Sequence, residues 1–286
     1  MHNTTLIGVD VGGTKINAGR VVSGTVEAKS HFKNPANEPA DVVLGTVIEA
    51  IEGVITPEVS GIGVGTPGLV DAETGTVMEI HNIPSWKDYP LQAKLKEHFN
   101  IPVFVNNDAN CYAVGEKYFG QGKGFNNIAA MTLGTGLGTG LILNGALYNG
   151  KNGGAGEFGI VKYLDRNLEY YCASKYFSSI HGSDSLALSE LARAGDQDAL
   201  NIFNEYGHHL GHAILTVMST VDPEIIILGG SIANAYPLFR KGMSEVIRNY
   251  PIARVAEDIQ IVVGSLSDGA ILGAAALFYD GSRGVE

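Results

Sequence analysis

The order of apolar and polar positions along the chain predicts alternating strands and helices. Short apolar runs at 6–10, 61–65 and 101–105 are each followed by glycine or polar residues, as in buried strands that end at turns. Helical patterns at 91–99 and 110–119 continue the alternation, which is typical of an α/β protein. Residues 40–55 carry apolar side chains at the spacing of an amphipathic helix: Leu44, Val47, Ile48, Ile51, Val54 and Ile55.

The pattern of the first residues returns near residue 128. A strand at 6–10, a glycine turn, a strand at 16–22 and a hairpin turn at Ser23-Gly24 are matched later in the chain. The matching elements are a strand at 128–133, a glycine turn, a strand at 141–143 and the hairpin signal Asn144-Gly145. We interpret this as an internal duplication that gives two related domains. Further predicted elements are helices at 186–194, 199–221, 236–248 and 269–278, and strands at 224–228 and 259–263.

Composition excludes several classes of protein. The 286 residues are 45% hydrophobic and 17% charged, which suits a folded chain with a sizeable core. Acidic residues outnumber basic ones by 30 to 19, and the net charge of −11 argues against a nucleic-acid or anionic-membrane surface. No run approaches the roughly 20 apolar residues of a membrane span, and the first residues lack a signal-peptide pattern, so we predict a cytoplasmic protein. Cys111 and Cys172 are too few for a disulfide framework, and we expect reduced thiols.

Two glycine-rich turns are candidate phosphate sites. The first, Asp-Val-Gly-Gly-Thr-Lys at 10–15, departs from the Walker pattern because strand, not helix, follows it. Its backbone N–H groups suit an anion-binding nest, Lys15 adds positive charge, and Asp10 suits a hydrated Mg²⁺. The second, Gly-Thr-Gly-Leu-Gly-Thr-Gly at 134–140, lacks the Rossmann spacing and mirrors the first. An ordinary glycine hairpin remains the alternative for each turn taken alone.

Other motifs suit a nucleotide base and a polyhydroxyl ligand. Gly229-Gly230 ends a predicted buried strand and would let a flat ring such as adenine approach the backbone, although a simple strand-to-helix turn explains it equally well. Asn107, Asp108 and Glu157 offer amides and carboxylates of the kind that bind sugar hydroxyls. Asp108 lies where a strand meets a helix, so it either caps that helix or takes a proton from a bound hydroxyl. The alternative for Glu157 is a solvated acid in a glycine-rich loop.

The remaining unusual residues have simpler interpretations. His208 and His212 are four residues apart on a predicted helix, but no third metal ligand is evident, so packed or exposed histidines are the simpler interpretation. Trp86 is expected to be a packing or interface anchor.

Six motifs in order resemble those of the ROK family of sugar kinases and sugar-responsive repressors. They are Asp-Val-Gly-Gly-Thr-Lys (10–15), Gly-Thr-Pro-Gly (65–68), Asn-Asp-Ala-Asn (107–110), Gly-Thr-Gly-Leu-Gly-Thr-Gly (134–140), Gly-Glu-Phe-Gly (156–159) and Leu-Gly-Gly-Ser-Ile-Ala (228–233). The resemblance implies the actin-like (ribonuclease H-like) ATPase fold, with two duplicated α/β domains around a cleft. We expect residues 1–117 with 270–286 to form an N-terminal sugar-kinase domain. Residues 118–269 are expected to form a C-terminal domain for nucleotide, sugar and dimerisation.

The resemblance also implies a role for each motif residue. Asp108 matches the catalytic base, which takes the proton of the sugar 6-hydroxyl. ATP is the implied donor, with Mg²⁺ held through water at Asp10. The implied sugar-binding residues are Gly68, Asn82, Asn107, Asp108, Glu157 and Glu169. The implied ATP and phosphate-binding residues are Asp10, Gly12, Gly13, Thr14, Lys15, Gly134, Thr135, Gly136, Gly138, Gly229 and Gly230.

One segment departs from the family pattern. ROK kinases typically follow Gly-Glu-x-Gly with a histidine and then a cysteine-rich loop that binds structural zinc. In this chain the histidine position is Ile160, and residues 161–167 contain no cysteine, so we predict no zinc. The loss of a histidine hydrogen bond would cost on the order of 1 kcal/mol. The sequence therefore leaves the identity of the acceptor sugar undetermined.

The leading hypothesis is therefore a glucokinase-type, ATP-dependent hexose kinase. The alternatives are a kinase for an N-acetylated hexosamine, mannose or fructose, and a non-catalytic sugar-binding regulator. A DNA-binding repressor fits poorly, because nine residues precede Asp10 and the charge is acidic. The acidic balance also disfavours polyphosphate as donor. The expected partners are a sugar, ATP and a second copy of the chain in a homodimer, with Trp86 or the helix at 199–221 as candidate contacts.

Overall fold

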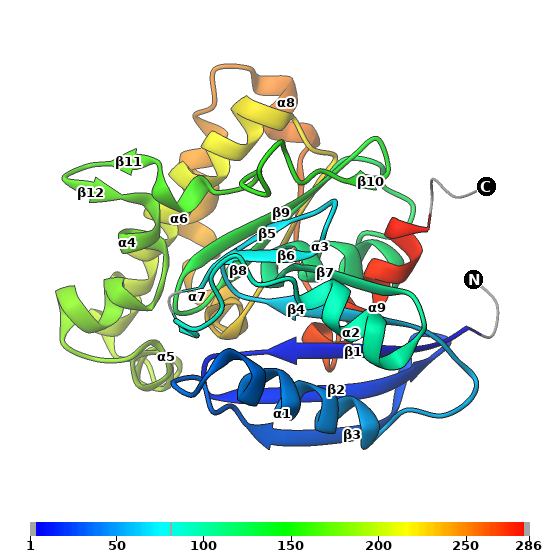
Figure 1. Ribbon diagram of the computed structural model, residues 1–286. Coiled ribbons are helices and arrows are strands. Elements are labelled where there is room, and N and C mark those ends of the chain that lie inside the picture. Colours follow the sequence, from blue (N-terminus) through cyan, green and yellow to red (C-terminus); the bar gives the residue numbers. More distant parts are fainter. Residues whose placement is uncertain (1–3, 81, 283–286) are drawn as a thin grey trace. The chain divides into compact units, whose positions relative to one another are not determined.

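The structure is a computed structural model and describes residues 4–80 and 82–282 (Figure 1). The chain divides into two compact units. The first unit contains Met1–Gly124, Ala146–Ala155 and Ser265–Glu286, and the second contains Phe125–Gly145 and Gly156–Gly264.

The first unit is built on a five-stranded sheet in the order β3-β2-β1-β4-β7. The first three strands are antiparallel neighbours, whereas β1, β4 and β7 run parallel. This arrangement follows from the short turns that join the first strands and from the helices that connect the parallel ones. The strands are β1 (Thr5–Val11), β2 (Lys15–Val22), β3 (Thr25–Lys33), β4 (Val59–Thr66) and β7 (Val103–Asn107), with a separate hairpin of β5 (Leu69–Asp71) and β6 (Thr76–Glu79).

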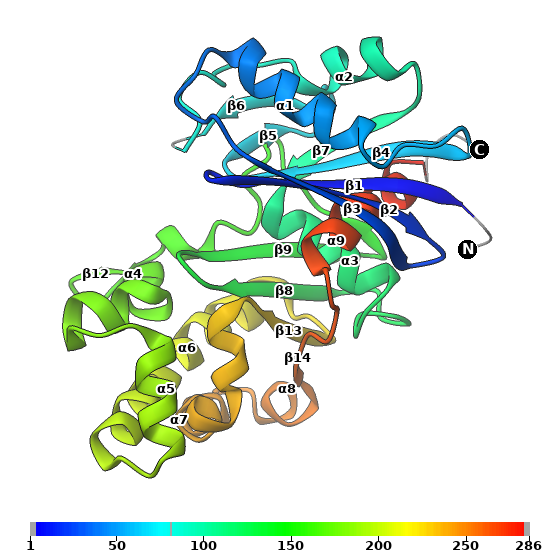
Figure 2. The same cartoon turned by 90° about the horizontal axis from the view of Figure 1, so that it is seen from below.

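Helices cover both faces of this sheet. Helices α1 (Ala40–Glu52) and α2 (Leu91–Phe99) lie on one face, and α3 (Asp108–Tyr118) and α9 (Gly269–Gly281) lie on the other (Figure 2). Helix α9 lies directly against the strands because glycines face it. A Cβ atom on Gly8 or Gly63 would overlap a carbonyl oxygen of α9, at Ile271 or Ala274 respectively.

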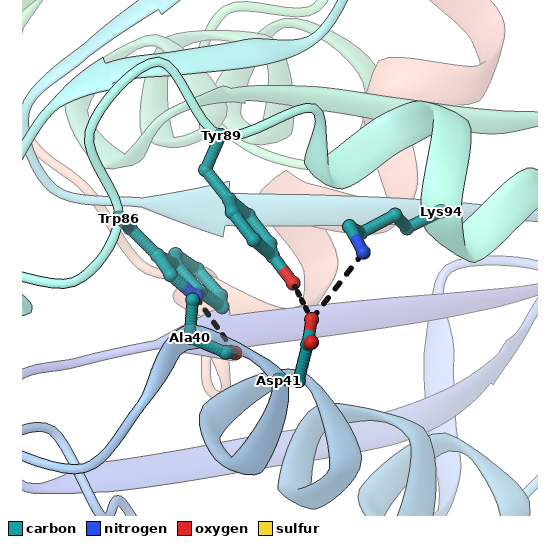
Figure 3. A network of polar contacts seen from close by, with 5 residues as sticks. All are labelled: Ala40, Asp41, Trp86, Tyr89 and Lys94. Atoms are coloured by element: carbon teal, nitrogen blue, oxygen red, sulfur yellow. Dashed lines mark hydrogen bonds and ion pairs between the residues drawn. The ribbon is translucent and has the colours of Figure 1, made fainter.

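Trp86 is a core residue of the first unit. Its side chain is 0% exposed and stacks on Tyr89 with ring centroids 5.3 Å apart. The indole Nε1 donates to the carbonyl oxygen of Ala40 at 3.3 Å, while the Tyr89 hydroxyl and Lys94 both donate to Asp41 (Figure 3). The packing interpretation is therefore confirmed. The suggestion that Trp86 contacts a partner is wrong, because the side chain is fully buried between α1 and the segment before α2 and has no surface left for a partner.

The second unit repeats the β2-β1-β4-β7 order of the first. Its strands are arranged β9-β8-β13-β14, in which β8 and β9 are antiparallel and β8, β13 and β14 are parallel. This repetition confirms the predicted duplication and the α/β fold. The strands are β8 (Ile128–Leu133), β9 (Leu137–Leu143), β13 (Ile225–Gly229) and β14 (Gln260–Val263), and a small hairpin pairs β11 (Lys162–Tyr163) with β12 (Arg166–Asn167). Strand β10 (Ala146–Leu147) belongs to the segment that the division assigns to the first unit.

The helices of the second unit build one large apolar core against its sheet. Helices α6 and α7 pack closely because Gly207 and Gly242 leave room for the backbone of the opposite helix. The helices are α4 (Leu168–Cys172), α5 (Ser185–Arg193), α6 (Gln197–Val221), α7 (Tyr236–Arg248) and α8 (Ala253–Asp258), together with the short helices η1 (Phe158–Ile160), η2 (Tyr176–Ile180) and η3 (Ser231–Ala235).

Two details differ from the sequence expectations. The second glycine turn is shorter than predicted, because β9 begins at Leu137 and leaves only Gly134–Gly136 as the turn. The division into units also differs from the expected boundaries, since it places Ala146–Ala155 in the first unit. Long-range contacts explain this placement. The side chain of Asn149 accepts from Asn106 at 2.9 Å, and the backbone N–H of Leu147 donates to Asp280 at 3.2 Å.

The histidines on α6 have side-chain partners. His208 lies 2.9 Å from Glu245 on α7, and His209 lies 3.1 Å from the Tyr163 hydroxyl. Across residues 4–80 and 82–282, His, Cys, Asp and Glu side chains do not gather in groups of three or more that could hold a metal ion. In the same residues, none of the helices combines the length and apolar character needed to cross a membrane.

Candidate functional site

In the first unit, three motifs meet at one edge of the sheet. Strands β1, β4 and β7 are parallel neighbours, so their carboxyl ends lie together. The register pairs Asp10 with Gly65, and Gly65 and Thr66 with Asn106 and Asn107. Motifs that are about 50 residues apart in the sequence are thereby brought to one place by strand pairing.

The turn from β7 into α3 separates Asn107 from Asp108. Asn107 is the N-cap: its side-chain oxygen accepts from the backbone N–H of Ala109 at 2.9 Å. Asp108 is the first residue of α3, is exposed, and also accepts from Ala109 at 2.8 Å. The helix therefore has a cap other than Asp108, and the Asp108 carboxylate stands at the open end of the helix, where the helix dipole favours its charge.

A cluster of buried amides supports this turn. Asn106 accepts from the Asn110 side chain at 2.9 Å and from the backbone N–H of Asn107 at 2.8 Å, while its own amide donates to Asn149. Asn107 also donates to the carbonyl oxygen of Gly68 at 2.9 Å. The predicted sugar ligand Asn107 thus has structural bonds of its own. Sequence reasoning missed Asn149, because no local pattern links it to residue 106.

Gly68 requires its lack of a side chain. Its φ of 84° lies in the left-handed region, and a Cβ atom there would overlap the carbonyl oxygen of Glu79. Its carbonyl oxygen receives the Asn107 amide, so Gly68 fixes the loop beside Asp108.

The first glycine turn is held from below by Asn34. The Asn34 side chain donates to the carbonyl oxygen of Gly12 at 2.6 Å, and its backbone N–H donates to that of Thr14 at 2.9 Å. Asn34 is 5% exposed, whereas Thr14 and Lys15 are exposed. These two bonds hold the carbonyl oxygens of Gly12 and Thr14, and the backbone N–H of Gly12 donates to the carbonyl oxygen of Lys15 at 2.8 Å, so the conformation of the turn is fixed. Asn34 belongs to none of the sequence motifs, so the sequence did not identify it as part of this site.

The predicted sugar ligand Asn82 lies against this turn. A Cβ atom on Gly13 would stand 3.0 Å from the Cβ atom of Asn82. The structure therefore places Asn82 beside a predicted phosphate-binding residue.

Asp10 and Asp108 both act on one buried thiol. Burial raises the pKa of Cys111 well above its usual value, and the negative charges of Asp108 and Asp10 raise it further. Both carboxylates are therefore close enough to Cys111 to act on its thiol electrostatically. Burial also raises the pKa of Asp10, and the hydrogen bond that the Asn17 side chain donates to Asp10 at 3.3 Å opposes this rise.

In the second unit, the second glycine turn and Gly229-Gly230 lie together at the carboxyl ends of the parallel neighbours β8 and β13. Strand pairing sets Gly229 opposite Thr132, near the end of β8. Gly230 has a φ of 83°, and a Cβ atom there would overlap the carbonyl oxygen of Leu133. The turn is fixed by a bond from Gly134 to Gly136 at 3.1 Å and one from Ser174 to Gly134 at 2.8 Å. The tip residue Thr135 is exposed, while Gly138 lies within β9.

Glu157 and Glu169 lie beside this turn. Glu169 accepts from the backbone N–H of Leu137 at 3.1 Å, and a Cβ atom on Gly136 would stand 2.7 Å from the Glu169 carboxylate. Burial raises the pKa of Glu157, and the nearby charge of Glu169 raises it further. The two predicted sugar glutamates are therefore close enough for their charges to interact, and Glu169 is also bonded to the backbone just beyond the glycine turn.

Comparison with known proteins identifies the family. The ROK family profile matches residues 6–280, which is nearly the whole chain. The chain belongs to the ROK family.

Its ROK relatives include kinases and repressors. The glucokinase of Thermotoga maritima is 30% identical, with 98% of this chain and 99% of that protein aligned. The xylose repressor of Bacillus subtilis is 27% identical, with 96% of this chain and 77% of the repressor aligned. A crystal structure of a ROK family glucokinase from Streptomyces griseus, in complex with glucose and AMPPNP, superposes with a TM-score of 0.79 at 29% identity. That alignment covers 96% of this chain and 98% of the glucokinase.

The departure from the ROK pattern at Ile160 is visible as a surface feature. Ile160 ends the helix η1 and is 73% exposed. The short hairpin of β11 and β12 follows, with Leu164 at its turn in the left-handed region. This chain therefore has a compact hairpin where ROK kinases typically have the cysteine-rich loop.

Proposed function

We propose that this ROK protein transfers the terminal phosphoryl group of ATP to the 6-hydroxyl of a hexose, with Asp108 as the general base. The observation that carries the proposal is the division of tasks at the start of α3. Asn107 caps the helix, and the exposed Asp108 carboxylate is positioned to accept a proton. Both glycine turns and the glucokinase relatives support kinase chemistry.

The donor groups would be held by the two glycine turns and the adenosine motif. In the first unit these are Gly12, Gly13, Thr14 and Lys15, and in the second unit they are Gly134, Thr135, Gly136, Gly138, Gly229 and Gly230. Phosphoryl transfer requires mainly orientation and charge neutralisation, which fixed backbone N–H groups supply. ATP as donor is supported by the S. griseus glucokinase complex, because AMPPNP is an ATP analogue.

The residues present fit a magnesium ion held through water. Mg²⁺ in kinases is bound by one or two carboxylates together with substrate phosphates, rather than by a cage of protein ligands. Asp10 is such a single carboxylate, at the strand end beside the first glycine turn. When bound, Mg²⁺ would neutralise charge on the donor phosphates. Asp10 would orient the water shell, and Lys15 would add a fixed positive charge.

The acceptor sugar would be contacted by Gly68, Asn82, Asn107 and Asp108 of the first unit and by Glu157 and Glu169 of the second. Carboxylates accept hydrogen bonds from hydroxyl groups and the amides donate to them, which suits a polyhydroxyl ring. Glucose is the leading acceptor, and an N-acetylated hexosamine, mannose or fructose is the alternative. ATP is the proposed donor. We also propose that the protein is cytoplasmic and forms a homodimer.

A non-catalytic sugar-binding regulator is the second candidate. It is favoured by the xylose repressor among the relatives and by Ile160, which replaces a polar residue of the ROK kinase pattern.

A coupled ADP-release assay over the four acceptor classes tests the proposal. We expect turnover of at least one sugar, and Asp108→Asn should lower kcat by about 10²- to 10⁴-fold while calorimetry still detects sugar binding. The matched variant is Asn107→Ala, which should lower stability by about 1 kcal/mol through loss of the cap, a cost that Asp108→Asn should not show. Sugar binding without turnover would favour the regulator, and an active Asp108→Asn enzyme would show that Asp108 is not the base.

A further inference from the structure

Two residues, Asn17 and His31, connect Asp10 to the edge strand of the first sheet. Strand pairing sets Asp10 on β1 opposite Asn17 on β2, and Asn17 opposite His31 on β3. Their side chains lie on one face of the sheet and are joined in sequence. The Asn17 amide donates to Asp10 at 3.3 Å, and the His31 Nδ1 lies 2.6 Å from the Asn17 side-chain oxygen.

The chemistry of these groups fixes the direction of each bond. A carboxylate only accepts, so the Asn17 Nδ2 must face Asp10 and the Asn17 Oδ1 must face His31. Since that oxygen also only accepts, Nδ1 of His31 carries the proton. With the amide turned the other way, two acceptors would face each other at Asp10. His31 therefore selects the amide orientation that gives Asp10 a donor.

A cavity and one ion pair adjoin this row. The row lines a cavity of about 460 Å³ together with Lys29, Asp268 and the first residues of α9. Lys29, two residues before His31 on β3, forms an ion pair of 2.6 Å with Asp268. That pair links β3 to Asp268, the residue before α9, and satisfies the Lys29 charge within the first unit.

We infer that Asn17 and His31 are positioning residues, which hold the Asp10 carboxylate in the orientation required to bind the water shell of the nucleotide-bound cation. The inference rests on the proposed function, because it takes Asp10 as the carboxylate that faces the cation. Asn17 acts on Asp10 directly, and His31 acts through Asn17. None of the motifs in the sequence includes either residue.

The experiment measures cation binding apart from turnover. Mn²⁺ is titrated into the full-length protein with ADP and followed by electron paramagnetic resonance, which counts free Mn²⁺. We expect His31→Ala to weaken Mn²⁺ binding by about threefold to tenfold, as for one lost hydrogen bond, and Asn17→Ala to weaken it further. His31→Gln, which can still donate to Asn17, should recover part of the loss. The Mg²⁺ concentration for half-maximal rate should rise in parallel, with the sugar KM unchanged.

His98→Ala is the matched control. His98 is an exposed histidine on α2 that pairs with Glu52 at 3.3 Å, so its loss removes a similar contact outside the row. Equal Mn²⁺ affinity in His31→Ala, Asn17→Ala and the unmodified protein would overturn the inference and leave the kinase proposal standing. A protein that turns over none of the sugars and binds no Mn²⁺ with ADP would overturn both. Thermal unfolding of each variant separates a positioning effect from a loss of fold.

Discussion

At the scale of single residues, Glu157 and Glu169 are two acidic side chains whose charges interact. Burial is the larger cause of the raised pKa of Glu157, and the charge of Glu169 raises this pKa further. Two neighbouring carboxylates are costly unless ligand hydroxyl groups or protons satisfy them. The pair is therefore suited to donors such as sugar hydroxyls, and its affinity should depend on pH.

The pH dependence of sugar binding follows from the sign of this shift. Glu157 accepts hydroxyl hydrogen bonds when ionised, and its raised pKa means that it becomes protonated at a higher pH than an ordinary glutamate. Sugar affinity should therefore fall early as the pH is lowered. Glu169→Gln removes the neighbouring charge and lowers the pKa of Glu157, so the acid limb should move to lower pH.

Calorimetric sugar titrations over a pH series check this prediction. Glu190→Gln, an exposed change on α5, serves as control and should leave the acid limb in place. An unmoved limb in Glu169→Gln would show that the two glutamates are not coupled.

At the scale of elements, glycines determine how closely α9 lies on the first sheet. Gly8 and Gly63 face the backbone of α9, and Gly273 of α9 faces the backbone of α3 at Cys111. At these glycines the backbone of α9 lies in direct contact with the backbone of the sheet and of α3. Gly8 is two residues before Asp10, and Cys111 is in the first turn of α3. The glycine content of the chain therefore has two sources, namely close packing here and the turns at the candidate site.

Two glycine substitutions should have opposite effects on stability. Gly63→Ala would place a methyl group on the carbonyl oxygen of Ala274 and should destabilise the protein by about 1–3 kcal/mol or more. Gly45→Ala, in the middle of α1 with no atom within 4 Å of the added methyl, should stabilise it by up to about 1 kcal/mol. Denaturant unfolding of both variants measures the difference. A neutral Gly63→Ala would mean that α9 does not lie this close to β4.

At the scale of the whole molecule, the chain is strongly acidic, and its two units share one order of four sheet strands. Each unit brings a glycine turn to the end of a central strand, at Gly12-Gly13 in one and at Gly134–Gly136 in the other. The net charge of −11 is unsuited to a DNA backbone. The charge helps to distinguish a kinase from a DNA-binding repressor, and the family includes both.

The acidic charge predicts a negative result in a DNA-binding assay. We expect no mobility shift of random-sequence duplex DNA at low salt, where non-specific attraction is strongest. The xylose repressor of Bacillus subtilis serves as a positive control. A shift that disappears as salt is added would contradict the prediction and favour a regulatory role.

Local sequence patterns were enough to predict the order of the main strands and helices, the duplication and the family. These features depend on local periodicity and on short motifs, such as Asn144-Gly145 at a hairpin and Asp-Val-Gly-Gly-Thr-Lys at a phosphate turn. Even Asn107 and Asp108 were identified as candidates, although their division of tasks was not, because either side chain can cap a helix.

The residues that support those motifs could not be predicted from local patterns. Asn34 beneath the first turn, Asn149 beside Asn106, and the row from Asp10 through Asn17 to His31 come together by strand pairing and chain return. Likewise, the burial of Trp86 depends on its stacking with Tyr89 and its bond to Ala40. Contacts of this kind join residues that are far apart in sequence and leave no periodic trace, so only the folded chain reveals them.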